Sequence, residues 1–147
     1  MIIPDVNLLV YAHDSQSRRH RAARDWWETL MNGTGSVGLP WVAVLGFIRI
    51  ATNPRILENP MDVGSVCARV RTWLDRPQTV VVHPGDRHAD ILFDLLEAVG
   101  SGGSLTTDAH LAALAIEHQA ELHSTDADMA RFPGLRWANP MGLISST

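Results

Sequence analysis

The sequence predicts an α/β fold, in which helices cover both faces of a mostly parallel sheet. Short apolar segments of strand length alternate along the chain with longer segments of helical periodicity. Strands that are separated by helices pair in parallel and lie between two helical layers. The length of 147 residues and the absence of repeats or linkers predict one domain over residues 1–141, followed by a tail over residues 142–147.

The first half of the chain begins with a short buried strand over residues 1–4 and a short helix directly after it. Residues 18–31 form the next helix, because Ala22, Trp26 and Leu30 recur at intervals of four residues. A short strand over residues 36–40 follows. The apolar segment over residues 41–52 is too long for a typical strand, so we expect a mostly buried helix there.

The second half starts with an amphipathic helix over residues 61–74. A strand over residues 78–84 is predicted by its valines and ended by its proline. A helix over residues 86–99 and a glycine-rich loop over residues 100–104 come next. Thr107 is the expected N-cap of the following helix. Two short strands are then predicted, over residues 121–126 and 135–140.

The chain carries 16 acidic and 12 basic residues, which gives a formal net charge of −4. This balance argues against a generic nucleic-acid-binding domain, which needs a basic surface. All 12 basic residues are arginines; arginine suits phosphate contacts, but codon usage explains the bias more simply. Cys67 is the single cysteine, so no internal disulfide can form. We find no signal peptide or membrane span and expect a cytoplasmic protein.

Four aspartates lie at the ends of predicted elements. Asp5 and Asp126 each follow a strand, Asp108 begins a helix, and Asp128 follows two residues after Asp126. Because the carboxyl ends of parallel strands meet at one edge of the sheet, we expect these side chains to gather there. Asp108 also suits the positive end of a helix, and Asp126 and Asp128 also suit a turn. Asp5 is harder to explain, since a carboxylate directly after an apolar strand costs desolvation free energy.

Carboxylates that are held close together repel one another, and a divalent cation between them offsets that repulsion. Mg²⁺ and Mn²⁺ prefer oxygen ligands, and Mg²⁺ commonly bridges carboxylates to a substrate phosphate. A cation there can lower the pKa of a water molecule and stabilise the charge that develops during phosphodiester cleavage. The four aspartates taken together therefore point to metal-dependent chemistry on a phosphodiester.

Four segments resemble, in the same order, the PIN-domain ribonucleases and among them the VapC toxins of bacterial toxin–antitoxin pairs: IIPDVNLLVYA, GFIRIATNP, TTDAHLAALAIEHQAEL and HSTDADMARFPGLRWANP. The resemblance spans almost the whole chain. It implies a three-layer α/β/α sandwich and a Mg²⁺- or Mn²⁺-dependent endoribonuclease of structured RNA, with transfer RNA favoured over ribosomal RNA. It also implies a homodimer and a cognate VapB-type antitoxin whose C-terminal segment enters the acidic site.

The resemblance assigns the catalytic carboxylates residue by residue. Asp5, Asp108 and Asp126 match the metal-binding acids of the family, and Asp128 matches a companion acid. Thr125 matches a hydroxyl residue that helps to orient the first acid. These assignments agree with the set that the predicted strand and helix ends indicate.

Other positions near the matched segments are expected to assist or to depart from the family. Asn7 matches a small polar residue beside the first acid, and Arg49 and Arg55 suit either phosphate contact or an ion-paired surface. Gly46 stands where many relatives carry a glutamate, which leaves one carboxylate fewer. His13 is the histidine closest to Asp5 in sequence, although a structural histidine is the simpler interpretation.

Two alternative functions remain open. The absence of a glutamate at Gly46 is compatible with a PIN-like module that binds RNA or antitoxin without cleaving RNA. A phosphatase of the haloacid dehalogenase type also places an aspartate after its first strand, as a nucleophile, but its motif is D-x-D and this chain has Asn7 in place of the second acid. The adjacent Trp26 and Trp27 cannot both face one core, which leaves one of them for a partner.

Overall fold

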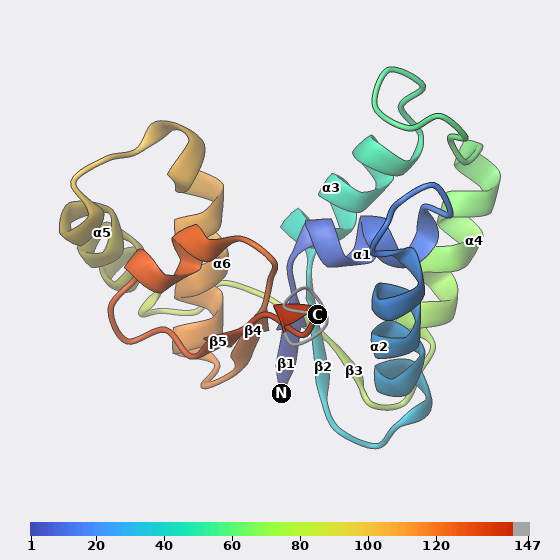
Figure 1. Ribbon diagram of the computed structural model, residues 1–147. Coiled ribbons are helices and arrows are strands. Elements are labelled where there is room, and N and C mark those ends of the chain that lie inside the picture. Colours follow the sequence, from blue (N-terminus) through green and yellow to red (C-terminus); the bar gives the residue numbers. More distant parts are fainter. Residues whose placement is uncertain (143–147) are drawn as a thin grey trace.

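The computed structural model describes residues 1–142. Five parallel strands form one sheet in the order β3–β2–β1–β4–β5 (Figure 1). The strands are β1 (Ile2–Pro4), β2 (Val37–Pro40), β3 (Thr79–Val82), β4 (Glu121–His123) and β5 (Trp137–Ala138). The chain builds outward from β1 through β2 and β3 and then returns to β4 on the other side of β1. This confirms the predicted α/β fold with a parallel sheet.

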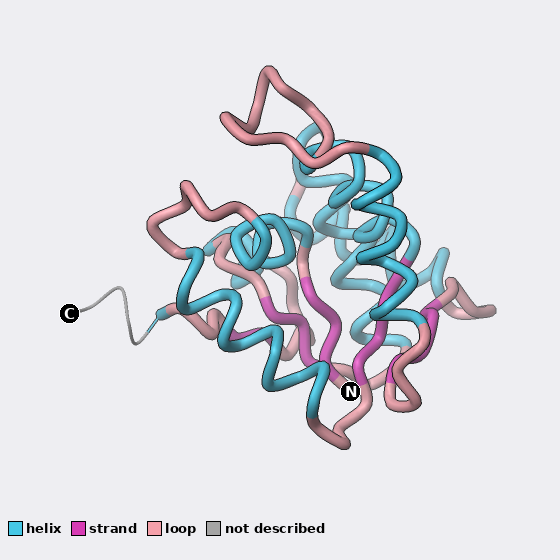
Figure 2. Tube along the Cα trace, turned by 90° about the vertical axis from the view of Figure 1, so that its right-hand side faces the viewer, coloured by secondary structure: helices cyan, strands magenta, loops and turns pink. Residues whose placement is uncertain are grey.

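Helices cover both faces of the sheet (Figures 1 and 2). One layer holds the first four helices and the other holds the last two, so the three-layer arrangement is also confirmed. No helix in residues 1–142 is long and apolar enough to span a membrane. The helices are α1 (Val6–His13), α2 (His20–Asn32), α3 (Trp41–Ala51), α4 (Val63–Leu74), α5 (His88–Val99) and α6 (Thr106–Glu117), with short 3₁₀ turns η1 (Gly103–Leu105) and η2 (Ala127–Arg131).

The sheet separates two hydrophobic cores. Val37 and Leu39 of β2 point into the core beneath α1–α4. Ile3 of β1 and Leu122 of β4 point to the opposite face and pack with α5 and α6. Side chains alternate between the two faces of a strand, so residues two positions apart share a face. This alternation determines which side chains share a face of the sheet at the carboxyl ends of β1 and β4.

The boundaries of the elements agree with the sequence prediction to within two residues, except at three places. β4 ends at His123 rather than at residue 126. Thr107 is not the N-cap of α6, because η1 runs directly into the helix and Leu105 occupies the cap position without a side-chain bond. Of the predicted tail over residues 142–147, residues 143–147 lie outside the described residues.

Gly46 lies where α3 packs closely against the start of α1. A Cβ atom added at Gly46 would lie 2.7 Å from Cγ2 of Val6, which directly follows Asp5. Valine is stiff at χ1, so its methyl group cannot easily turn away. Only a residue without a Cβ atom fits at this contact without a shift of its neighbours. A glutamate there would need α1 and α3 to move apart.

Gly46→Ala is expected to lower the free energy of unfolding by about 1–2 kcal/mol, because overpacking outweighs the roughly 1 kcal/mol by which alanine favours a helix over glycine. Urea denaturation measures the change. Gly64→Ala in α4 is the matched control, since its Cβ would meet only Oδ1 of Asp62, at 3.9 Å. Adding Val6→Ala should restore most of the loss, whereas a Gly46→Ala protein at least as stable as wild type would contradict the close contact.

Candidate active site

The carboxyl ends of β1 and β4 lie side by side where the strand order reverses. Pro4 is in register with His123, and the Asp5 N–H donates a hydrogen bond of 2.8 Å to the His123 carbonyl. The crevice at such a reversal is where open α/β sheets bind ligands. The topology thus brings Asp5 next to the segment that holds Asp126, although 120 residues separate them in sequence.

Asp5 is a fixed and desolvated carboxylate. Its residue is only 6% exposed, and its side chain accepts hydrogen bonds of 2.7 Å from the Ser124 hydroxyl and from the Val6 N–H. Burial raises the pKa of Asp5 above its usual value; the two hydrogen bonds lower it in part, and the charge of Asp126 raises it again. A carboxylate in this environment gains free energy from any nearby cation.

Ser124 connects the two acids and was not identified from the sequence. Its buried hydroxyl donates to Oδ2 of Asp5 and accepts a 3.0 Å hydrogen bond from the Asp126 N–H. The resemblance implies Thr125 as the orienting hydroxyl, but within residues 1–142 it is Ser124 that bonds to Asp5, and the Thr125 side chain makes no hydrogen bond. Strand alternation explains the difference, because Ser124 follows Leu122 by two residues and Asp5 follows Ile3 by two, so both point to the α6 side.

Asp126 and Asp128 follow β4 in a short 3₁₀ turn. Asp126 is the N-cap of η2 and accepts a 2.9 Å hydrogen bond from the Asp128 N–H. The Asp128 side chain is 53% exposed and lies 3.9 Å from the Arg131 guanidinium, which makes a weak surface ion pair. Asp126 is therefore held in place more firmly than Asp128.

Asp108 lies in the first turn of α6 and is half-buried. Its pKa is raised to about 6, first by burial and then by the negative charges of Asp5, Asp126 and Asp128. A hydrogen bond with Asp126 favours the protonated form of Asp108 further. The four aspartates thus interact as one group, which we call the carboxylate cluster.

The carboxylate cluster has the donor atoms of a site for a hard divalent cation. Within residues 1–142, no three His, Cys, Asp or Glu side chains are already placed around a single ion position. Mg²⁺ is commonly held by only one or two carboxylates together with water molecules, so a preformed cage is not required. Burial and then the repulsion between the aspartates raise the pKa of Asp108, and a bound cation would relieve that repulsion.

The expected substrate-positioning residues lie apart from the carboxylate cluster. Asn7 is exposed in the first turn of α1, while Arg49 lies in the last turn of α3 and Arg55 in the turn that follows. Both arginines are exposed, and no carboxylate in residues 1–142 lies within ion-pair distance of them. They lie at the end of α3 that points away from the sheet (Figure 1).

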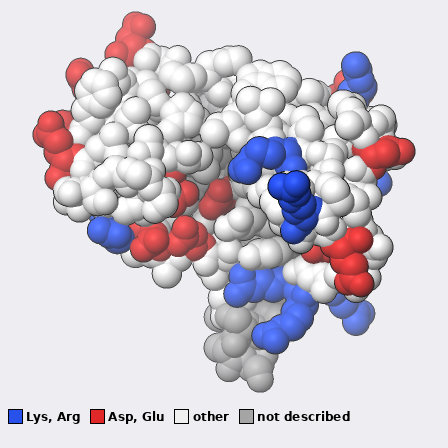
Figure 3. All heavy atoms as spheres, turned by 90° about the horizontal axis from the view of Figure 1, so that it is seen from above, with Lys and Arg blue, Asp and Glu red and all other residues white. Residues whose placement is uncertain are grey.

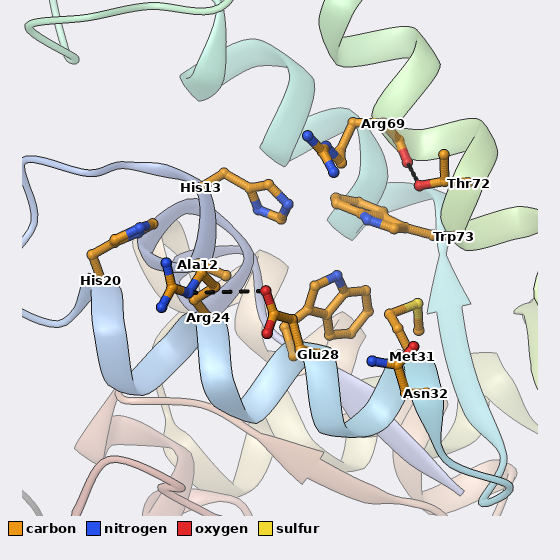
Figure 4. Close-up of a pocket in the computed structure, with 11 residues that line it drawn as sticks. Ala12, His13, His20, Arg24, Glu28, Met31, Asn32, Arg69, Thr72 and Trp73 are labelled. Atoms are coloured by element: carbon orange, nitrogen blue, oxygen red, sulfur yellow. Dashed lines mark hydrogen bonds and ion pairs between the residues drawn. The ribbon is translucent and has the colours of Figure 1, made fainter.

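His13 does not join the carboxylate cluster. Its ring packs against Phe47 and Trp73, with centroid distances of 5.1 and 5.3 Å, and its Nδ1 bonds to the Leu9 carbonyl. It lines a cavity of about 400 Å³ between α1, α2 and α4 (Figure 4). None of the four aspartates lines this cavity. His13 is therefore a packing residue, as the simpler interpretation held.

The premise that the adjacent tryptophans cannot both face one core is wrong, whereas the role of one of them toward a partner stays a prediction. Trp27 is buried in the core beneath α1–α4. Trp26 is half-buried, and its Nε1–H donates a 3.0 Å hydrogen bond to Nδ1 of His123, whose Nε2 bonds to Glu121. Both tryptophans therefore pack against the core beneath α1–α4, and Trp26 also reaches His123 of β4.

Comparison with known proteins identifies the family. The family model described as PIN domain matches residues 2–135. The sequence is 45% identical to Ribonuclease VapC33 of Mycobacterium tuberculosis over 141 residues, which cover 96% of this chain and 99% of that protein.

Two solved structures share the fold at low sequence identity. VapBC2 from Rickettsia felis, bound to a DNA fragment from its promoter, matches with a TM-score of 0.68 and 17% identity over 95% of this chain and 98% of that chain. Mycobacterium tuberculosis VapC20, described as a sarcin–ricin loop cleaving toxin, matches with a TM-score of 0.66 and 14% identity over 92% and 99%. The chain therefore belongs to the PIN-domain family and, within it, to the VapC proteins.

Proposed function

We propose that this protein is the ribonuclease toxin of a toxin–antitoxin pair, and that it cleaves structured RNA with the help of Mg²⁺ or Mn²⁺. The observation that carries the proposal is the carboxylate cluster at the reversal of the strand order. The near full-length similarity to a protein named as a VapC ribonuclease supports the same activity.

The four aspartates have different proposed roles, because they differ in burial and in hydrogen bonding. Asp5, Asp108 and Asp126 would hold the cation, and Asp128 assists from the rim. A divalent cation in this site supplies an acidified water and stabilises the charge that develops on the phosphate. Ser124 keeps Asp5 and the Asp126 backbone in place. We further propose that Asn7, Thr125, Arg49 and Arg55 position the RNA.

Purified protein is expected to cleave RNA when Mg²⁺ or Mn²⁺ is present and to lose this activity in EDTA. Sequencing the new RNA ends in cells that express the protein identifies the substrate. We propose transfer RNA; ends that map to ribosomal RNA, or to the sarcin–ricin loop named for VapC20, would overturn that choice. No cleavage of any RNA pool with either metal would favour a binding module without catalysis.

The pH dependence of the reaction follows from Asp108. Its carboxyl must be ionised to hold a cation, and its pKa in the metal-free protein is about 6. The Mn²⁺ concentration for half-maximal cleavage is therefore expected to rise as the pH falls below about 6. The measurement is a series of Mn²⁺ titrations of the initial cleavage rate between pH 5 and 8. A half-maximal concentration that is constant over this range would exclude Asp108 as a ligand.

The proposed partners are a second copy of the chain and a VapB-type antitoxin. Trp41 and Leu45 are exposed one turn apart on α3, at 48% and 59%, and Phe93 of α5 is 57% exposed. Exposed apolar side chains of this size favour a protein contact. Light scattering of the purified chain tests the homodimer, and co-purification with the product of the reading frame directly upstream tests the antitoxin.

A further inference from the structure

The charges of this chain are distributed unevenly between its two halves. Residues 1–82 carry nine of the 12 arginines and seven of the 16 acids, whereas residues 83–147 carry three arginines and nine acids. Residues 1–82 contain β1–β3 and α1–α4, and the described part of residues 83–147 contains α5, α6, β4 and β5. Although the whole chain is acidic, the α1–α4 half has a net positive charge.

The carboxylate cluster lies at the boundary between the two halves. Asp5 belongs to the α1–α4 half, and Asp108 and Asp126 belong to the other. Seen from above, acidic side chains gather near this boundary and over the α5–α6 half, while most arginines in view lie over the α1–α4 half (Figure 3). An RNA strand with one phosphate at the cluster would be repelled on the α5–α6 side and attracted on the other.

The loop after α1 and the first turn of α2 carry three arginines close together in sequence. Arg18, Arg19 and Arg21 are all exposed, and no carboxylate in residues 1–142 lies within ion-pair distance of them. Arg24, one turn further on, is partly neutralised by Asp25 and Glu28, at 3.8 and 3.9 Å. The free positive charge is thus concentrated at the start of α2, on the side of the molecule to which the strands point (Figure 1).

Arg19 is ordered by contacts with α1. Its guanidinium lies 5.3 Å from the centre of the Tyr11 ring, and Nη1 donates a 3.4 Å hydrogen bond to the Tyr11 hydroxyl. The ring of His20 is tied to the same helix through the Tyr11 carbonyl, at 2.9 Å. A guanidinium fixed by stacking loses less side-chain entropy when it binds a phosphate. The segment therefore offers one preorganised cation, Arg19, with an exposed arginine on either side of it in sequence.

We infer that Arg18, Arg19 and Arg21 form a binding surface for the RNA phosphate backbone, along which the substrate leaves the carboxylate cluster over α1 and the start of α2. This inference rests on the proposed ribonuclease function. It assigns a direction to the bound RNA, away from α5 and α6. RNA suits the surface better than an apolar partner does, because the segment presents guanidinium groups of the kind that bind phosphates.

The test compares two double variants with the same change in charge. Arg18→Gln with Arg21→Gln removes two cations of the proposed surface and leaves Arg19 on Tyr11. Arg71→Gln with Arg87→Gln removes two exposed arginines from α4 and from the start of α5. Binding of a fluorescein-labelled RNA stem–loop is measured by anisotropy in EDTA, which prevents cleavage, at salt concentrations from 50 to 200 mM.

The Arg18/Arg21 variant is expected to bind about tenfold more weakly than wild type, with a salt slope that is smaller by about 1.5, as two lost phosphate contacts predict. The Arg71/Arg87 variant should stay within about twofold of wild type. Equal weakening in both variants would overturn the inference, because it would indicate a non-specific effect of net charge. So would an unchanged RNA affinity of the Arg18/Arg21 variant combined with weaker binding of a polyglutamate peptide, since that result would indicate an acidic protein as the partner.

The cleavage assay separates this inference from the proposed function. If wild-type protein cleaves RNA in an Asp5-dependent manner but both double variants bind RNA alike, the binding surface is wrong and the ribonuclease function stands. If wild-type protein neither binds nor cleaves RNA with Mg²⁺ or Mn²⁺, the proposed function fails and the inference fails with it.

Discussion

Asp5→Asn is expected to lower the rate of RNA cleavage roughly a thousandfold, the magnitude typical for the loss of one essential charge-stabilising group. Asparagine has nearly the same shape; its oxygen can accept from the Val6 N–H while its amide group donates to the Ser124 hydroxyl oxygen, so the side chain can keep its place. The substitution removes the negative charge of a buried carboxylate that would bind the cation. The fold should be retained, because the substitution removes a buried charge instead of creating one.

Single-turnover cleavage of an RNA substrate in Mn²⁺ measures this effect. Asp94→Asn is the matched control, since Asp94 is exposed on α5 and its substitution changes the net charge by the same amount. The control should cleave at the wild-type rate. An Asp5→Asn protein that cleaves as fast as the control would show that Asp5 takes no part in the reaction.

Asp108→Asn is expected to abolish cleavage and at the same time to stabilise the metal-free protein. The folded-state pKa of about 6 lies above the ordinary value of 3.8, so the folded chain binds the extra proton more tightly than the unfolded chain. Stability must therefore fall as the pH rises from about 4 through 6, as Asp108 ionises beside its neighbours. Asparagine removes this cost, and we expect a gain of about 1 kcal/mol at pH 7.5 after allowing for solvent screening of a half-exposed group.

Urea denaturation in EDTA at pH 5 and at pH 7.5 tests the stabilising effect. The gain from Asp108→Asn should be larger at pH 7.5 than at pH 5. Asp128→Asn serves as the comparison within the cluster, and its effect should be smaller because that side chain is 53% exposed. A loss of stability at pH 7.5 in the Asp108→Asn protein would mean that neither burial nor the neighbouring charges penalise the ionised Asp108 in the folded chain.

The sequence was sufficient to predict the fold and the location of the acids. Alternating strand and helix segments predicted the parallel sheet, and the residues after the strands pointed to Asp5 and Asp126. Two acids so far apart in the sequence could be paired because the carboxyl ends of neighbouring parallel strands meet at one edge. The order of the strands could not be predicted from periodicity. The structure shows that the order reverses between β1 and β4, and this reversal brings Asp5 and Asp126 together.

Contacts between elements were harder to predict. Choosing Ser124 over Thr125 required the register of β4 against β1, which places Ser124 on the same face as Asp5. The close approach of Gly46 to Val6 depends on how α3 crosses α1. Trp26 bonds to His123 across 97 residues of sequence. Each of these contacts joins two elements through side chains, so it depends on how the two elements are placed against each other as well as on the periodicity within each one.

Calorimetric titration of Mn²⁺ into the purified chain at pH 7.5 tests the central claim, that the four aspartates form one cation site. Wild-type protein should bind Mn²⁺ with one site per chain, Asp126→Asn should weaken binding by at least about tenfold, and Asp94→Asn should leave it unchanged. Binding by wild type that Asp126→Asn does not alter, or no binding by wild type, would contradict the claim.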